Sequence, residues 1–373
     1  MKIKTLLQYE PEITKKDINA VNDYLLSGGF LTEFKKTELF EKRISEFISC
    51  DDTILLPNGT LTLFSILKAL GINETSKVIV PNYTMAATAF SVCETGAEII
   101  FCDIEWPSLC LSIDSLEETI NKNKNINAIM FMNANGRYPS YKIDNLVELC
   151  SSKNIYLIED SAQALGSFYP DGRHMGTVGV AGSISFSMPK IITTGQGGAV
   201  ISNNKKIIKG IRRYKNFGRK SSGGIDIHET VGLNMKFTDL QAILGISQLE
   251  RINETIQTKK QNFKLLKKLT KNKYLELLDN NIDYTTPWFF EVITKYRKKL
   301  VTWLEKYHIK SRIMYPELNK QEAFKKHNQH KDTFKVSQRI SSEGLWLPSH
   351  PKLTKQNIEM IASVLNEFNP RIN

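Results

Sequence analysis

The sequence predicts an α/β fold, with a large N-terminal domain around a mostly parallel sheet and a smaller C-terminal α+β domain. Short apolar strand-like segments alternate with helix-like segments over residues 53–158, which is typical of βαβ units. The 373 residues are long enough for two domains. A helical segment that begins near Thr238 keeps an apolar stripe and links the two parts. We place the division between residues 1–240 and 241–373.

The composition is that of an ordinary globular protein, with 41% hydrophobic and 24% charged residues. The formal net charge of +11 does not indicate nucleic-acid binding, because the lysines are scattered among Asn and Ile. One basic helical run, from Lys259 to Lys273, is interpreted as a solvated face. The five cysteines lack metal-ligand spacing and a C-x-x-C pair, so we expect reduced core residues, no metal site and a cytoplasmic location. The N-terminal residues carry charges where a signal peptide needs its apolar region, and no apolar run reaches about 18 residues, so we expect neither a signal peptide nor a membrane span.

Two helices and a series of strands are expected in order. Residues 11–50 form two helices separated by Gly28 and Gly29. The first carries an apolar stripe of Ile18, Val21, Tyr24 and Leu25, and the second one of Leu39, Phe40, Ile44 and Phe47. Strands are expected at residues 53–56, 78–80, 98–104, 128–132, 155–158 and 199–202.

Polar or aromatic residues follow the first two strands. Gly59 permits a close backbone approach, and Thr60 can cap the next helix and offer its hydroxyl to an anion, although a plain turn has the same pattern. Tyr83 can stack on a planar ligand or close the edge of the core. Because ligands bind at the carboxyl ends of parallel strands, both turns are candidate sites.

Asp160 ends a strand of apolar or aromatic residues. A carboxylate at that depth needs a partner, and a protonated ring nitrogen would suit it, whereas a helix cap is the alternative. Further along, Ser185 lies five residues before Lys190, so a turn between them can bring hydroxyl and amine to opposite ends of one small ligand.

Lys190 follows an apolar segment and precedes a glycine-rich run at 195–198. Burial penalises the ammonium form of a lysine, which favours the neutral amine that imine chemistry needs. A lysine on a surface loop is the alternative. The basic stretch from Arg212 to Arg219 and a polar segment at 220–229, expected to be mobile, follow it.

The helix that links the two domains begins at the capping-box spacing of Thr238 and Gln241. A strand is expected at 288–294, a helix at 296–307, and two further segments at 311–316 and 347–351. The mixture of helix and strand indicates a compact α+β unit.

These segments, in this order, resemble the sugar aminotransferases of the DegT/DnrJ/EryC1/StrS family, which are pyridoxal 5'-phosphate enzymes of fold type I. The resemblance covers nearly the whole chain, and the ordered set of motifs is specific. The motifs are 27–29, 58–60, 79–88, 159–166, Ser185 and Phe186 with Lys190, 194–198, 232–241 and 347–349.

The resemblance implies a role for each residue around the cofactor ring. Lys190 forms the internal aldimine and later carries protons, and Asp160 pairs with the pyridinium nitrogen, which makes the cofactor an electron sink. Tyr83 stacks on the ring, and Gln163 lies near the ring hydroxyl.

The resemblance also implies how the phosphate is held. Thr60 with the nearby backbone amides, including Gly59, and Ser185 hold the phosphate. Asn234 reaches the phosphate of the neighbouring subunit, so the sites are shared within a homodimer.

The implied activity is amino transfer, since family members with dehydratase activity carry His in place of Lys190. Segments 286–289 and 312–316 look like those of 4-aminotransferases related to perosamine synthase. We therefore expect a nucleotide-linked 4-keto-6-deoxyhexose to be aminated at C4, with glutamate as donor, for a polysaccharide such as an O-antigen. Amination at C3 and a non-catalytic regulator that binds the cofactor are the alternatives.

Four residues are candidate substrate contacts. Arg219 and Arg312 are candidates for the diphosphate or the donor carboxylate. Asn135 and the unusual Gln196 can line the sugar pocket, since both lie where the chain departs from the usual family pattern. The sequence leaves open which base the nucleotide carries, the configuration of the sugar, the pathway of the product and any assembly beyond a dimer.

Overall fold

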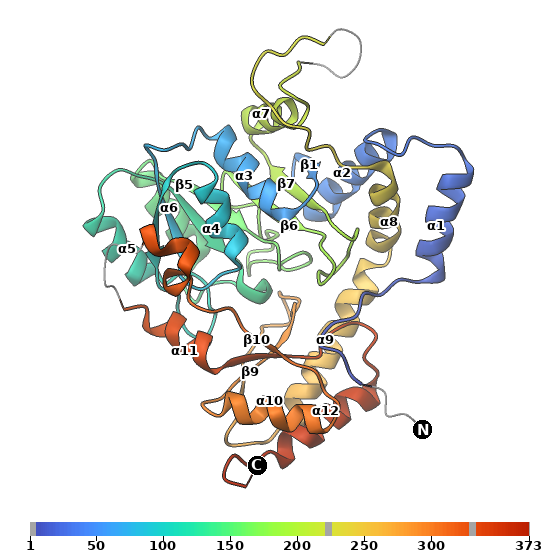
Figure 1. Ribbon diagram of the computed structural model, residues 1–373, viewed down its shortest axis with the longest axis vertical. Coiled ribbons are helices and arrows are strands. Elements are labelled where there is room, and N and C mark those ends of the chain that lie inside the picture. The colour runs from blue at the N-terminus through green and yellow to red at the C-terminus, as the bar shows by residue number, and fades with distance from the viewer. Residues whose placement is uncertain (1–4, 221–225, 328–332, 373) are drawn as a thin grey trace.

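The computed structural model describes residues 5–220, 226–327 and 333–372 and contains two sheets (Figure 1). The larger has seven strands in the order β1-β7-β6-β5-β4-β2-β3. All its pairs from β6 to β3 are parallel, whereas β7 is antiparallel to both neighbours, so the expected mostly parallel sheet is confirmed. The strands are β1 (Asp52–Leu56), β2 (Lys77–Pro81), β3 (Glu98–Cys102), β4 (Ile126–Met132), β5 (Tyr156–Asp160), β6 (Ala181–Ser185) and β7 (Gly198–Ser202).

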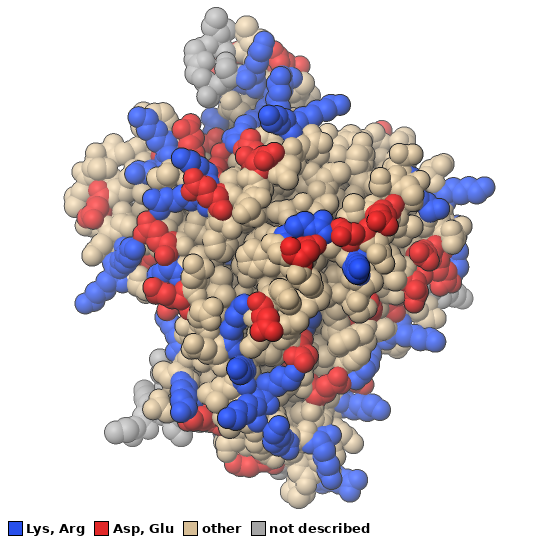
Figure 2. All heavy atoms as spheres, turned by 180° about the vertical axis from the view of Figure 1, so that it is seen from behind, with Lys and Arg blue, Asp and Glu red and all other residues tan. Residues whose placement is uncertain are grey.

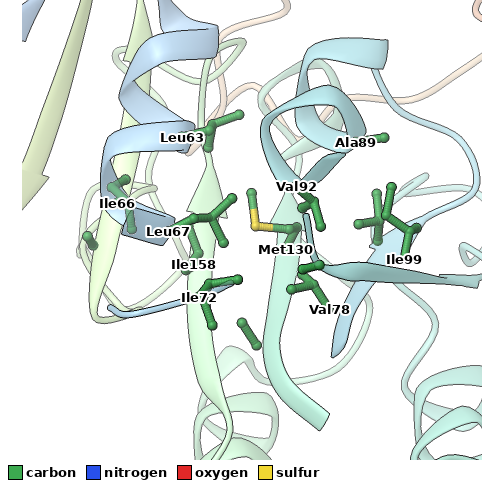
Figure 3. Close-up of a cluster of buried hydrophobic side chains, with 14 of the residues drawn as sticks. Leu63, Ile66, Leu67, Ile72, Val78, Ala89, Val92, Ile99, Met130 and Ile158 are labelled. Carbon is green, nitrogen blue, oxygen red and sulfur yellow. The ribbon is translucent and has the colours of Figure 1, made fainter. Parts of the chain in front are cut away.

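Helices cover both faces of this sheet. On one face, Leu63 and Leu67 of α3 and Val92 of α4 pack with Met130 of β4 in a cluster of buried apolar side chains (Figure 3). Such burial of aliphatic side chains is the main force that holds helices on a sheet. The helices are α1 (Lys15–Leu26), α2 (Lys35–Ile48), α3 (Gly59–Ala69), α4 (Ala86–Cys93), α5 (Ile113–Lys122), α6 (Ile143–Ser152), α7 (Lys205–Lys215) and α8 (Asp239–Leu249), with a 3-10 turn η1 (Ala134–Gly136).

The second sheet has four antiparallel strands in the order β10-β11-β9-β8. Its strands are β8 (Glu276–Leu277), β9 (Phe290–Ile293), β10 (Arg312–Ile313) and β11 (Gly344–Leu347). The helices around it are α9 (Ile252–Leu269), α10 (Arg297–Lys306), α11 (Lys335–Glu343) and α12 (Lys355–Glu367), with 3-10 turns η2 (Leu318–Lys320) and η3 (Glu322–His327).

The link between the two parts is made by two helices, α8 and α9, rather than one. Thr238 caps α8 as expected, since its hydroxyl accepts from the backbone N–H of Gln241 at 3.2 Å. Helix α8 packs against α1 and α2, and α9 then runs toward the four-stranded sheet (Figure 1). The division at residue 240 therefore stays a prediction.

The apolar stripe expected on α1 is wrong. Ile18 and Leu25 are 58% and 50% exposed, whereas Asp17 and Tyr24 are buried. The Asp17 carboxylate accepts from Arg251 at 2.6 Å, and the Tyr24 hydroxyl donates to Asp239 at 3.1 Å. Polar contacts therefore hold this helix, which periodicity alone does not reveal. The stripe of α2 is confirmed, with its Phe40 and Ile44 fully buried.

Charge is mixed over the surface. On the face shown in Figure 2, Lys and Arg side chains are spread with Asp and Glu among them. Within the basic run on α9, however, Lys259 is only 3% exposed, so the interpretation of this run as a solvated face is wrong at that position. No helix of the described part of the chain is long and apolar enough to cross a membrane. Of the segment 220–229, residues 221–225 lie outside the described residues.

Candidate active site

A cavity of about 260 Å³ lies at the carboxyl ends of β5 and β6 and the beginning of α3. Parallel α/β sheets bind ligands at this edge. Its lining brings together six of the residues expected at the site, namely Gly59, Thr60, Asp160, Gln163, Ser185 and Lys190, together with Gln196 and with Asn58, Leu63, Met85, Ala87, Ala162 and Ser187.

The beginning of α3 forms one end of the cavity. The side chain of Asn58 caps the helix by accepting from the N–H of Leu61 at 2.9 Å, so the expectation that Thr60 is the cap is wrong. Thr60 lies in the first turn instead, where its hydroxyl is left for a ligand. A helix N-terminus next to the Ser185 hydroxyl is a suitable place for a phosphate, because the helix dipole favours negative charge there.

Gly59 is needed at this turn because a Cβ built on it would lie 3.1 Å from Cβ of Ser185. Gly59→Ala is therefore expected to push α3 and β6 apart and to weaken binding of pyridoxal phosphate several-fold. The measurement is a titration of cofactor-free protein followed by absorbance. Gly210→Ala in α7, where the nearest atom would lie at 3.8 Å, is the control. Equal affinity of the two variants would contradict the role of Gly59.

Asp160 is at the other end of the cavity, 5% exposed. One oxygen of its carboxylate accepts from the Thr88 hydroxyl at 2.6 Å, and the other from the N–H of Ala162 at 3.2 Å. Burial raises the pKa of this carboxyl, while Thr88, Ala162 and the charge of Lys190 act to lower it. The carboxylate lines the cavity and can accept a further hydrogen bond there, which would suit a cationic group such as a protonated ring nitrogen.

The neighbouring Glu159 has a different task, because successive residues of a strand point to opposite faces. Its carboxylate accepts from the hydroxyl of Tyr169 and the N–H of Gly176, both at 2.8 Å, and from the N–H groups of Val178 and Gly179. Glu159 thus holds the segment that leads into β6, while Asp160 faces the cavity.

Lys190 lines the cavity between these ends. Its Nζ atom lies 4.2 Å from the centroid of the Trp288 ring, whose indole N–H donates to the carbonyl of Pro189 at 2.6 Å. Burial lowers the pKa of Lys190 to about 8, against the opposing effect of Asp160 and assisted by the positive charge of Arg312. More of this amine is therefore neutral near pH 7 than of an ordinary lysine, as a nucleophile or proton acceptor requires.

The structure does not bring Tyr83 to the cavity, so its assignment as the stacking residue is wrong in this structure. Tyr83 is 2% exposed and packs among apolar side chains, with its ring 5.9 Å from that of Tyr315. The turn after β2 directs it into the core, and Met85, two residues later and 46% exposed, lines the cavity in its place.

Asn135 also lies away from the cavity lining, contrary to expectation. It is 2% exposed, and its side-chain amide is bonded within the protein, to the backbone of Phe289 and to Glu291. Its own backbone N–H donates to the side-chain oxygen of Gln163 at 2.7 Å. Asn135 therefore orients Gln163 rather than contacting a substrate.

The remaining candidates lie outside the cavity of this chain. Asn234 is exposed and lies in the segment that precedes α8. Arg219 forms an ion pair with Asp226 at 2.8 Å. Arg312 is exposed, 5.5 Å from the Trp346 ring, and its charge acts on Lys190.

Several residues of the site were missed from the sequence. Thr88 is a polar residue in the first turn of an otherwise apolar helix, a signal that points to a functional hydroxyl. Trp288 and Tyr315 come from the second part of the chain, and no local pattern marks their contact with the site; Tyr315 is hydrogen-bonded to Gln163.

Known proteins resemble this chain over nearly its whole length. Residues 11–366 match the DegT/DnrJ/EryC1/StrS aminotransferase family. The GDP-perosamine synthase of Vibrio cholerae is 31% identical over 366 residues, which cover 96% of this chain and 98% of that protein. The GDP-perosamine synthase of Escherichia coli O157:H7 is 30% identical, covering 98% and 99%.

Two proteins of known structure have the same fold. The aminotransferase PseC of Helicobacter pylori, involved in the biosynthesis of pseudoaminic acid, has a TM-score of 0.89 at 22% identity and covers 97% of this chain and 98% of its own. The putative sugar aminotransferase Spr1654 of Streptococcus pneumoniae, solved in PLP and PMP forms, has a TM-score of 0.89 at 24% identity, with coverage of 97% for this chain in both forms, and of 98% and 97% for its own.

Proposed function

This chain belongs to the DegT/DnrJ/EryC1/StrS aminotransferase family, and from that premise we propose that it transfers an amino group from glutamate to C4 of a nucleotide-linked 4-keto-6-deoxyhexose. It is a pyridoxal 5'-phosphate-dependent aminotransferase of the α/β class. One observation carries the proposal: Lys190 and Asp160 line one cavity that begins at a helix N-terminus. An anion site at one end, a carboxylate at the other and an amine between them match the phosphate, the ring nitrogen and the aldehyde of the cofactor.

The side chains of the cavity fit pyridoxal phosphate. The first turn of α3, with Thr60 and the Ser185 hydroxyl, would hold the phosphate, and Asp160 would hold the ring nitrogen. Gln163 would contact the ring, with its orientation fixed by Asn135. When bound, the cofactor supplies an electron sink for the carbon that loses a proton.

Lys190 would carry that proton. Its lowered pKa, about 8, lets the amine accept a proton near neutral pH and return it as the ammonium form. Asp160 would keep the ring nitrogen protonated, since its carboxylate is fixed by Thr88 and Ala162. Trp288 shields one side of the amine from water.

The substrate class is supported by the relatives. Two proteins at least 30% identical over nearly the whole chain are GDP-perosamine synthases. A transaminase of Campylobacter jejuni, named for UDP-4-amino-4,6-dideoxy-N-acetyl-beta-L-altrosamine, is 33% identical over 258 residues that cover 67% of this chain. Arg312, whose charge acts on Lys190, is suitably placed to bind the carboxylate of glutamate or the diphosphate of the sugar.

The experiment is incubation of the purified holoenzyme with glutamate and, separately, with GDP- and UDP-linked 4-keto-6-deoxyhexoses. We expect one of them to yield a 4-amino sugar, identified by mass spectrometry and by the position of the nitrogen in the NMR spectrum. Nitrogen at C3 would replace the proposal with 3-amination. Absence of an amino sugar from every substrate would favour a regulator that binds the cofactor without turnover.

The homodimer with shared sites is part of the same proposal. Asn234 is exposed and absent from the cavity of its own chain, and its neighbours Val231 and Leu233 are 86% and 46% exposed. Exposed apolar side chains also lie on and after α1, including Leu26 at 78% and Phe30 at 63%. Exposed apolar surface of this kind is typical of protein interfaces.

Subunit complementation tests the shared site. Lys190→Ala lacks its own amine, and Asn234→Ala lacks the residue offered to the partner, so each homodimer is expected to be inactive or nearly so. After subunit exchange, a mixed dimer keeps one intact site, and up to about a quarter of wild-type activity should return in an equal mixture. If native mass spectrometry confirms that subunits have exchanged and no activity returns, the shared site is contradicted.

A cytoplasmic location also belongs to the proposal. All five cysteines are free in the structure, and Cys102, Cys110 and Cys150 are buried. Unpaired cysteines are typical of a reducing compartment.

A further inference from the structure

Lys259 of α9 is a buried lysine in an unusual setting. It is 3% exposed, and its Nζ atom donates to the carbonyl oxygens of Trp288 at 3.0 Å and Ser349 at 2.5 Å. Among the described residues, no carboxylate forms an ion pair with it. Lys215, which is equally buried, differs in having an ion pair with Glu33 at 2.6 Å. Burial lowers the pKa of Lys259 to about 7.

Burying a lysine that has no ion pair with a carboxylate lowers the stability of the fold, so we expect the residue to bring a compensating benefit. The two carbonyls that Lys259 joins belong to loops far apart in the sequence. The mechanism proposed above does not use Lys259. However, Trp288, to which Lys259 donates, also contacts Lys190 of the candidate site.

Trp288 connects Lys259 to Lys190. The carbonyl of Trp288 accepts from Lys259, its indole N–H donates to the carbonyl of Pro189, and the face of its ring lies 4.2 Å from Nζ of Lys190. The ring is 2% exposed and packs against Phe289 and Trp346. A shift of the Trp288 backbone would therefore move the wall that covers the amine.

The loop of Ser349 reaches Lys190 by a second route. The N–H of Ser349 donates to the carbonyl of Gln8 at 3.3 Å, and the hydroxyl of the next residue, Tyr9, donates to the carbonyl of Lys190 at 3.3 Å. The side-chain nitrogen of Lys259 thus joins the Trp288 segment, which contacts the backbone at Pro189, to the Ser349 segment, which reaches the backbone of Lys190 through Gln8 and Tyr9.

We propose that Lys259 is a positioning residue that fixes Trp288 against Lys190 and so sets the orientation and the protonation of the amine. The inference rests on the role proposed for Lys190 and deepens it. Lys259 does not touch the cavity, because it is absent from the lining and acts through the Trp288 backbone. Without it, the Trp288 loop loses an anchor and water gains access to Lys190.

The test uses Lys259→Met, which keeps the length of the side chain, and Lys264→Met, an exposed position on the same helix, as control. In cofactor-free protein, the rate at which limiting acetic anhydride modifies Lys190 is followed against pH by peptide mass spectrometry. In Lys259→Met, we expect the midpoint of the pH profile of Lys190 modification to rise by about half a pH unit or more, toward the value of an ordinary lysine. The reason is that the Lys190 amine becomes better hydrated. In the holoenzyme, kcat should fall about tenfold with little change in KM, the mark of a misplaced catalytic group.

Trp288→Leu is the second variant, and it should raise the midpoint in the same way even if Lys259→Met does not fold. Unchanged midpoints in the folded variants would overturn the proposal. A shift in Lys259→Met without one in Trp288→Leu would also overturn it, because Lys259 would then act by another route. The modification profile needs no sugar, so failure of the amination reaction and failure of this inference are distinguishable.

Discussion

Lys190→Ala is expected to abolish amino transfer, with a loss of about 10⁴-fold or more, because both the nucleophile and the proton carrier are removed. The visible absorption band of the bound cofactor should disappear, since no other amine lines the cavity in the described part of the chain. The measurement is absorbance of protein reconstituted with pyridoxal phosphate, together with the product assay.

The matched control is Lys264→Ala, which removes an exposed lysine from α9. This variant should keep the band and the activity of the wild type. An unchanged spectrum in Lys190→Ala would show that another amine binds the cofactor.

Asp160→Asn is expected to lower kcat by about 10²- to 10³-fold, the size typical of losing one preorganised electrostatic contact. The amide keeps the shape of the side chain and its hydrogen bond from Thr88, but it carries no charge to hold a protonated ring nitrogen. Cofactor affinity and kcat, measured by absorbance titration and by steady-state kinetics, report the effect.

Glu159→Gln provides the comparison for Asp160, because the two carboxylates are adjacent and both buried at the end of β5. Its amide nitrogen would face N–H donors that the carboxylate now accepts from, so the free energy of unfolding should fall by about 1–3 kcal/mol while the cofactor spectrum is kept. If Asp160→Asn retained the kcat of the wild type, the assignment of Asp160 to the ring nitrogen would be wrong.

The mostly parallel sheet and the placement of Lys190, Asp160, Ser185 and Gly59 at one edge could be predicted from the sequence, whereas the strand order could not. Alternating strands and helices imply a parallel sheet, and parallel strands bring their carboxyl ends together. Each of these residues lies at or after a strand end, so the topology alone brings them to one cavity.

The direction of side chains in irregular turns could not be predicted in this way. Tyr83 and Met85 both follow β2, and only the path of the turn decides which of them lines the cavity. Asn135 has a backbone φ of 55° in η1, which turns its amide toward β9 instead of the cavity. No periodic pattern describes such positions.

Contacts between segments that are distant in the sequence could not be predicted either. Trp288 contacts Lys190 because α9 and the loops before β9 and after β11 are held together by Lys259. The basic run on α9 hides one buried lysine among exposed ones, and helical periodicity does not tell a lysine that donates to carbonyls from one in solvent.

The most direct test of the account is to locate the lysine that binds the cofactor. The wild-type protein is reconstituted with pyridoxal phosphate, reduced with borohydride so that the cofactor becomes permanently attached to its amine, digested and mapped by mass spectrometry. The account predicts that the modified residue is Lys190. Attachment at another lysine, such as Lys259 or Lys215, or no attachment at all, would contradict it.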